Sequence, residues 1–145
     1  MTTSPTRPGG IHHVRLTVTD IARSKAFYTE VFGLEPAIDF SAEADQPGVR
    51  EDQTKFYGGC VFDLDGQLLG LRPVAADGDT FDSTRVGLDH IGLAVGSVDD
   101  LRAAVERLDA LGVEHGDVEE LSDHGMAILS IQDPDDINLE LTSPL

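Results

Sequence analysis

Two histidines occupy equivalent places in two stretches of similar sequence. His13 lies in IHHVRLTV, residues 11–18, and His90 lies in LDHIGLAV, residues 88–95. Each stretch alternates as a half-buried β-strand does, and each histidine falls on the face opposite the larger apolar side chains. Glu140 falls on the corresponding face of the last strand-like run. Two neutral imidazoles and one carboxylate, with other coordination positions open, suit a divalent Fe, Mn, Ni, Co or Zn ion.

These three residues converge only if two sheets curl together with those faces inward. A single strand histidine more often packs or faces solvent than binds a metal, and a single glutamate at the end of a strand is more often simply exposed. The matched positions of His13, His90 and Glu140 favour metal ligands over that ordinary interpretation. His12, whose counterpart in the second stretch is Asp89, lacks this support, and we interpret it as structural.

Each stretch begins a similar series of predicted elements. A helical pattern follows over about residues 21–32, with Asp20 as its candidate N-cap, and again over about 98–111, where SVDD forms a capping-box-like start. Each half then contains one or two further strands, for example over residues 55–62 and 126–131, and closes with an acidic turn and an apolar strand. This order predicts two βαβββ modules.

The predicted fold class is α+β, with paired βαβββ modules whose sheets curl into a cup. The modules together form one expected domain, divided into a disordered N-terminus, a first module, a linker and a second module at residues 1–9, 10–73, 74–86 and 87–145. Residues 41–53 are polar and acidic, and we interpret them as a mobile loop, with a lid as the alternative.

The composition restricts the partners that the chain can have. Its 145 residues are enough for one domain with a core. The formal net charge of −17 argues against nucleic acid and anionic membranes, because phosphate groups are bound mainly by Lys and Arg. No apolar run approaches the roughly 18 residues of a membrane span, and the single cysteine, Cys60, agrees with a reducing compartment. We therefore expect a cytoplasmic protein that binds neither nucleic acid nor a membrane.

Three segments resemble a known family: HHVRLTVTDIARSKAFYTEVFGLEP, LDHIGLAVGSVDDLRAAVERLDALGV and AILSIQDPDDINLELT. They are similar to the vicinal oxygen chelate superfamily, which includes glyoxalases, bleomycin-resistance proteins and extradiol dioxygenases. The resemblance implies paired βαβββ modules in a cup around a divalent metal, usually in a homodimer, with His13, His90 and Glu140 as ligands. The fourth ligand of glyoxalases corresponds to Gly70, which has no side-chain donor, and the tyrosine of the dioxygenases corresponds to Ser130.

Other polar side chains are candidates for lining the same cup. Arg15 shares the face of His13, and Arg72 lies in the last strand of the first module; guanidinium groups suit carboxylate or phosphonate oxygens. Tyr57 and His124 are further candidates for substrate binding. A surface arginine and an exposed loop histidine are the ordinary interpretations of these residue types, and no residue is assigned a catalytic role.

The leading hypothesis is a divalent-metal-dependent enzyme of lyase, isomerase, transferase or dioxygenase type. Its metal would polarise a carbonyl, hydroxyl or enolate of a small oxygenated molecule as a Lewis acid. The alternative is a metal-free protein that sequesters a drug or natural product and thereby confers resistance. The sequence leaves open whether the protein is an enzyme, and whether the cup forms within one chain or across a homodimer.

Overall fold

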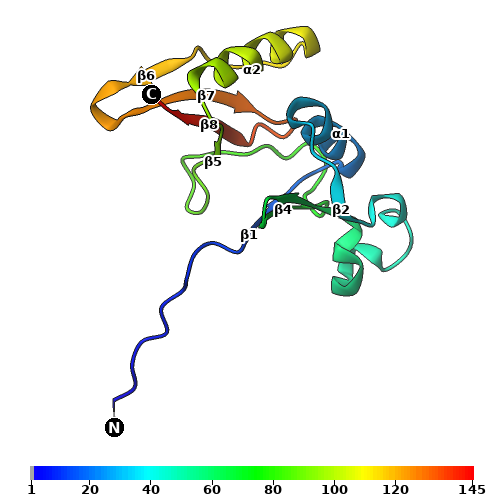
Figure 1. The fold of residues 1–145 in the computed structure, drawn as a ribbon. Coiled ribbons are helices and arrows are strands. Elements are labelled where there is room, and N and C mark those ends of the chain that lie inside the picture. Colours follow the sequence, from blue (N-terminus) through cyan, green and yellow to red (C-terminus); the bar gives the residue numbers. More distant parts are fainter. Residues whose placement is uncertain (1) are drawn as a thin grey trace. The chain divides into compact units, whose positions relative to one another are not determined.

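Residues 2–145 form two four-stranded sheets with equivalent strand order, and Figure 1 shows the fold as a ribbon. The computed structural model describes residues 2–145. The first sheet has the order β1-β4-β3-β2 and consists of β1 (His13–Thr17), β2 (Pro36–Asp39), β3 (Cys60–Leu64) and β4 (Gln67–Arg72). The second has the order β5-β8-β7-β6 and consists of β5 (Ile91–Ala94), β6 (Glu119–Leu121), β7 (Met126–Gln132) and β8 (Asn138–Pro144).

One α-helix follows the first strand of each sheet. In the chain, α1 (Ile21–Phe32) comes between β1 and β2, and α2 (Val98–Leu111) between β5 and β6. In each sheet the first strand pairs in parallel with the last, and the other pairs are antiparallel. The predicted α+β fold with paired βαβββ modules is confirmed. No helix within residues 2–145 is long and apolar enough to cross a membrane.

Contacts divide the chain into two compact units. The first contains residues 2–25 and Leu34–Ala75, and the second contains Ala26–Gly33 and Ala76–Leu145. The C-terminal part of α1 therefore belongs to the second unit. The module boundaries expected from the sequence stay a prediction, as does disorder over residues 1–9, of which Met1 lies outside the described residues.

Alternation along the strands of the second unit separates an apolar face from a polar one. α2 packs against β7 and β8, and its Leu101 and Leu108 are fully buried. The buried strand residues are Ala127, Leu129, Ile131, Leu139 and Leu141. Ser130 and Glu140 are partners in register and lie on the opposite face of the sheet. The strand pattern thus directs Glu140 away from the helix.

Both helices begin at the side-chain caps that the sequence predicted. Asp20 Oδ1 accepts a hydrogen bond of 3.0 Å from the backbone N–H of Arg23. Ser97 Oγ accepts one from the N–H of Asp100, whose carboxylate accepts one from the N–H of Ser97. Each such cap stabilises its helix by about 1 kcal/mol. α2 ends at Gly112, whose φ of 68° is favourable for glycine.

The strand predicted over residues 55–62 is wrong in its first half. Gln53–Gly58 forms 3-10 turns, and β3 starts only at Cys60. Phe56 and Tyr57 have φ values of 48° and 57°, so the backbone turns where an extended run was expected. The apolar and aromatic residue types in this stretch suit a strand, and the left-handed conformation of two consecutive aromatic residues has no signal in the sequence.

Candidate functional site

His90 lies directly before β5, between two carboxylates of the second unit. Its Nδ1 atom is 2.6 Å from Oδ1 of Asp89, and its Nε2 atom is 4.0 Å from Oε1 of Glu140. β5 and β8 are neighbouring parallel strands in which Gly92 pairs with Glu140, and this register brings Glu140 close to the start of β5. The side chains of His90 and Glu140 are 43% and 23% exposed, so a group from solvent can reach both.

The orientation of the His90 ring makes this pair suited to binding a cation. An ionised carboxylate only accepts hydrogen bonds, so the short contact with Asp89 requires Nδ1 to be the donor. In a neutral ring, Nε2 then carries a lone pair that faces Glu140. The 4.0 Å distance between Nε2 and Oε1 is too long for a hydrogen bond. Two ligand atoms that bind the same divalent ion lie about 3.0–3.4 Å apart when each metal–ligand bond is about 2.1 Å. A small side-chain rotation lets both bind one ion, so these donors fit a divalent metal.

His13 lies in the first unit, on the exposed face of β1. Leu16 and Val18 are buried on the other face, as the alternation predicted. The Nδ1 atoms of His12 and His13 are 3.0 Å apart, and the two rings meet edge-on. One ring therefore donates a hydrogen bond to the other. His12 precedes the strand, so strand alternation does not govern it, and the sequence interpretation did not include this contact.

The structure brings two of the three predicted metal ligands together. His90 and Glu140 face each other in the second unit, whereas His13 belongs to the first unit. Among the residues that the structure describes, no three His, Cys, Asp or Glu side chains form a group that could hold a metal ion. The three-residue ligand set stays a prediction, and the contact between His90 and Glu140 is the part of it that has a measured geometry.

Arg15 and Arg72 both lie over aromatic rings of the first unit. The guanidinium carbon of Arg72 is 3.7 Å from the ring centre of Tyr57. The guanidinium carbon of Arg15 is 5.8 Å from the same ring and 5.7 Å from that of Phe56. Arg15 pairs with Gly70 on β4, the strand that ends at Arg72. We call Arg15, Arg72, Phe56 and Tyr57 the arginine–aromatic cluster, and it contains three of the four predicted substrate-binding residues.

Two features of the arginine–aromatic cluster are typical of a binding site. Phe56 and Tyr57 both have positive φ, a conformation that costs of order 1–3 kcal/mol per residue and persists only where the surroundings hold it. The Nε atom of Arg72 is buried and has no hydrogen-bond partner within the described chain. Strained backbone of this kind clusters at active sites and ligand clamps, and an unsatisfied buried donor is uncommon enough to call for an explanation such as a bound water or ion.

The structure does not link His124 to the candidate ligands of its own unit. His124 is exposed in the short 3-10 turn Ser122–His124 before β7, and within residues 2–145 no hydrogen bond links it to His90 or Glu140.

Cys60 is 1% exposed, and burial raises the pKa of its thiol to about 12. Because the thiolate is the nucleophile, Cys60 is inert near neutral pH.

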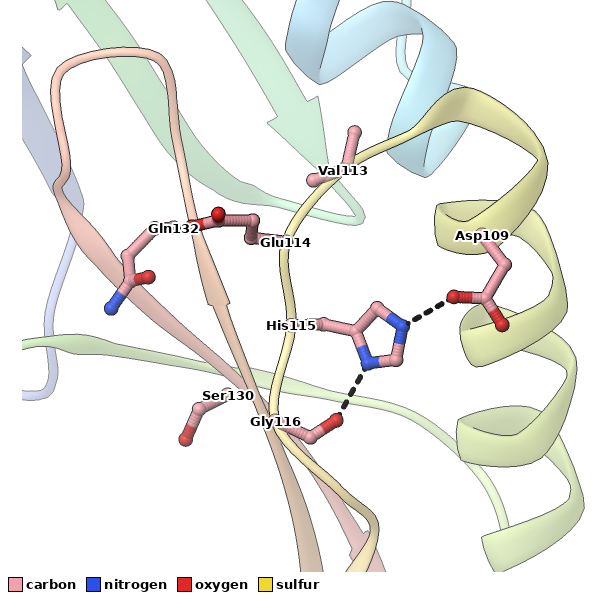
Figure 2. A pocket seen from close by; sticks show the side chains of 7 residues that line it. All are labelled: Asp109, Val113, Glu114, His115, Gly116, Ser130 and Gln132. Carbon is pink, nitrogen blue, oxygen red and sulfur yellow. Dashed lines mark hydrogen bonds and ion pairs between the residues drawn. The ribbon is translucent and has the colours of Figure 1, made fainter.

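A hollow in the second unit has no counterpart in the sequence predictions. It has a volume of about 650 Å³ and, as Figure 2 shows, is lined by Asp109, Val113, Glu114, His115, Gly116, Ser130 and Gln132. His115 Nε2 is 2.7 Å from Asp109 Oδ1, and its Nδ1 is 2.6 Å from the carbonyl oxygen of Gly116. Both partners are acceptors, so the ring donates twice, as only the imidazolium form does. His115 therefore has no free nitrogen with which to act as a base.

The pH dependence of stability is expected to report this His115 contact. The hydrogen bond to Asp109, and then that to Gly116, raises the pKa of His115 above its ordinary value. The resulting stabilisation is fully present below the unfolded pKa of about 6.5 and is lost as the pH rises through the folded pKa. In urea unfolding, the wild type should exceed His115→Gln in stability by a larger margin at about pH 5.5 than at about pH 9. A margin that does not change with pH contradicts the contact.

Comparison with solved structures shows where this fold occurs. A glyoxylase/bleomycin resistance protein/dioxygenase domain from Frankia sp. EAN1pec is 29% identical, with a TM-score of 0.74 over 96% of this chain and 94% of that one. The fosfomycin resistance protein FosX from Listeria monocytogenes is 19% identical, with a TM-score of 0.68 over 96% of each chain. A putative glyoxalase family protein from Bacillus anthracis is also 19% identical, with a TM-score of 0.68 over 98% of this chain and 100% of that one. The last two, at these identities, show the fold alone.

Comparison of sequences gives the family. No curated protein matches the chain. The family model described as the Glyoxalase/Bleomycin resistance protein/Dioxygenase superfamily matches residues 10–141, a range that contains β1 to β7 and the part of β8 that carries Glu140. The resemblance seen in the paired histidine stretches is thereby confirmed, and the chain belongs to the glyoxalase/bleomycin resistance protein/dioxygenase superfamily.

Proposed function

We propose that this protein is a divalent-metal-dependent enzyme in which His13, His90 and Glu140 bind the ion. The observation that carries the proposal is the pair of His90 Nε2 and Glu140 Oε1, two electron-pair donors that face each other across 4.0 Å. His13 is the counterpart of His90 in the repeated sequence of the first module. The proposal includes a cup shared by the two sheets, formed within one chain or across a homodimer, in a cytoplasmic protein.

The proposed ion is Fe, Mn, Ni, Co or Zn, because imidazole and carboxylate ligands together suit these metals. When bound, it would polarise a substrate oxygen as a Lewis acid and stabilise negative charge that develops there. With one carboxylate among the three ligands, a divalent ion leaves the site a net charge of about +1. Lyase, isomerase, transferase and dioxygenase reactions all fit this ligand set.

In this proposal, the arginine–aromatic cluster binds the substrate. The contact with Tyr57 uses the flat face of the Arg72 guanidinium and not its N–H edges, and a guanidinium can bind carboxylate or phosphonate oxygens in a bidentate way. His13 and Arg15 are two residues apart on β1, which separates them by about 6.6 Å along the strand. An oxygenated anion of small-molecule size spans that distance. His124 is the remaining proposed substrate contact.

Removal of both arginines is expected to weaken the binding of small anions strongly. Phenylphosphonate is a suitable probe, because it combines an aromatic ring with a doubly charged group. Each charge-assisted hydrogen bond contributes roughly 1.5–3 kcal/mol, so Arg15→Ala with Arg72→Ala should weaken binding by at least about 100-fold in an NMR titration. Arg102→Ala, which removes an exposed arginine of α2, serves as the charge control. Equal affinity of the double variant and the wild type contradicts the assignment.

A second function, metal-free sequestration of a small molecule, is favoured by the surroundings of Gly70. A Cβ atom at Gly70 would lie 3.4 Å from both Cγ and Nε of Arg15, so the Arg15 side chain fills the space beside it. Gly70 is also the position that corresponds to the fourth ligand of glyoxalases. A cluster that holds an anion through Arg15 and Arg72 needs no metal for affinity.

Metal content decides between the two functions. Tag-free protein purified without chelator should contain about one equivalent of a transition metal by mass spectrometry, and His13→Ala, His90→Ala and Glu140→Ala should each lose it. If the wild type takes up none of Fe(II), Mn, Ni, Co or Zn while phenylphosphonate still binds, the metalloenzyme is wrong and sequestration stands.

A further inference from the structure

We infer that Asp89 is a positioning residue that orients His90 for metal binding. The inference rests on the proposed metal site, since it concerns the ring that would supply one of the ligands. Asp89 Oδ1 and His90 Nδ1 are 2.6 Å apart, a separation typical of a strong, charge-assisted hydrogen bond. The bond uses the ring nitrogen that faces away from Glu140 and leaves Nε2 bare on the other side.

His90 depends on such a partner because its surroundings do not hold the ring. The His90 side chain is 43% exposed, and residue 90 lies outside β5, which starts at Ile91. An exposed imidazole without a partner rotates freely and exchanges between its two neutral tautomers. A carboxylate is an acceptor only, so of the two neutral tautomers Asp89 selects the one with a proton on Nδ1 and a lone pair on Nε2.

The same arrangement recurs in the first module with a different residue. His12 is the counterpart of Asp89 one position before His13, and the Nδ1 atoms of the two histidines are 3.0 Å apart. In both modules the preceding residue therefore reaches Nδ1 of the candidate ligand. An imidazole can donate or accept, so His12 does not dictate the tautomer of His13, whereas Asp89 does dictate that of His90.

Because of this difference, the ring of His90 is better oriented for metal binding than the ring of His13. A carboxylate that accepts the second ring N–H raises the basicity of a metal-binding histidine, and loss of such a partner typically weakens metal binding 10–100-fold. The side chain of Asp89 is 77% exposed, so its replacement removes little packing and leaves the fold intact.

The test compares Asp89→Ala and Asp89→Asn with the wild type in the full chain. Long-range ¹H–¹⁵N spectra of metal-free protein at one fixed pH report which nitrogen of His90 carries the proton. We expect Nδ1–H in the wild type and a mixture of tautomers in Asp89→Ala. Asp89→Asn should lie between the two, because its amide oxygen can still accept the bond from Nδ1–H while its NH2 group can also donate one to an unprotonated Nδ1. Glu106→Ala removes an exposed carboxylate of α2 in the same unit, and this charge control should behave as the wild type.

Zinc affinity in a competition titration gives the second readout. We expect it to fall 10–100-fold in Asp89→Ala, to fall less in Asp89→Asn and to change less than about twofold in Glu106→Ala. An unchanged tautomer in Asp89→Ala, or unchanged zinc affinity when the wild type binds zinc, overturns the inference. If the wild type binds no metal at all, the proposed function fails by itself, and the tautomer of the metal-free protein still decides the role of Asp89.

Discussion

Replacing Glu140 with alanine is expected to weaken divalent metal binding by at least about 100-fold, more than loss of a partner that merely orients a ligand. Glu140 is the one anionic member of the proposed ligand set, so its removal deletes a coordination bond and the charge that offsets the ion. Its Oε1 atom also accepts a hydrogen bond of 3.3 Å from Thr142 Oγ1, which holds the carboxylate on the polar face of β8. Calorimetric titration of metal-free protein with zinc or manganese measures the effect.

Two variants separate coordination by Glu140 from the general acidity of the protein. Glu140→Gln keeps the shape and one oxygen ligand but not the charge, and it should fall between the wild type and Glu140→Ala. Glu106→Ala makes the same change in net charge on α2 and should bind as the wild type does. Equal losses in Glu140→Ala and Glu106→Ala would show that long-range electrostatics, rather than coordination, governs the affinity.

Replacing Asp133 with alanine is expected to lower the free energy of unfolding by about 4 kcal/mol, because three hydrogen bonds end at one buried carboxylate. Asp133 is 4% exposed. Its Oδ1 accepts from the backbone N–H groups of Asp135 and Ile137, each at 2.9 Å, and its Oδ2 accepts from the Tyr28 hydroxyl at 2.9 Å. Replacement by alanine removes the acceptor of two backbone N–H groups in the turn between β7 and β8 and of the Tyr28 hydroxyl in α1. Urea unfolding followed by circular dichroism measures the change.

Tyr28→Phe is the matched control for Asp133→Ala. It removes one of the three hydrogen bonds and keeps the ring, so we expect a loss of about 1–2 kcal/mol. Tyr28 is fully buried in the C-terminal part of α1, and 105 residues separate it from Asp133. If Asp133→Ala costs no more than Tyr28→Phe, the two backbone hydrogen bonds contribute nothing to stability.

The sequence predicted those features that depend on local periodicity. Alternation along β1 and β8 indicated the polar faces of His13 and Glu140, because successive side chains of a strand point to opposite sides. The cap residues Asp20 and Ser97 were recognisable because capping uses residue types at fixed short spacings. The repeated order of strand, helix and further strands followed from the same local signals, and it predicted the fold class.

Contacts between residues far apart in the chain were decided by the tertiary structure. The stacking of Arg72 on Tyr57 depends on two consecutive aromatic residues with positive φ, and local preference alone favours extended structure there. The bond between Tyr28 and Asp133 arises where the C-terminal part of α1 joins the second unit. No periodic pattern encodes either contact.

By itself, the sequence determined the superfamily, the paired βαβββ modules and the side of the sheet that carries His13 and Glu140. The tertiary structure alone decided that His90 lies between Asp89 and Glu140, with one ring nitrogen engaged and the other bare. The physical reason is that strand alternation sets only the face on which a side chain lies. The rotation of an imidazole ring, and hence its chemistry, is set by the hydrogen-bond partners that folding brings to it.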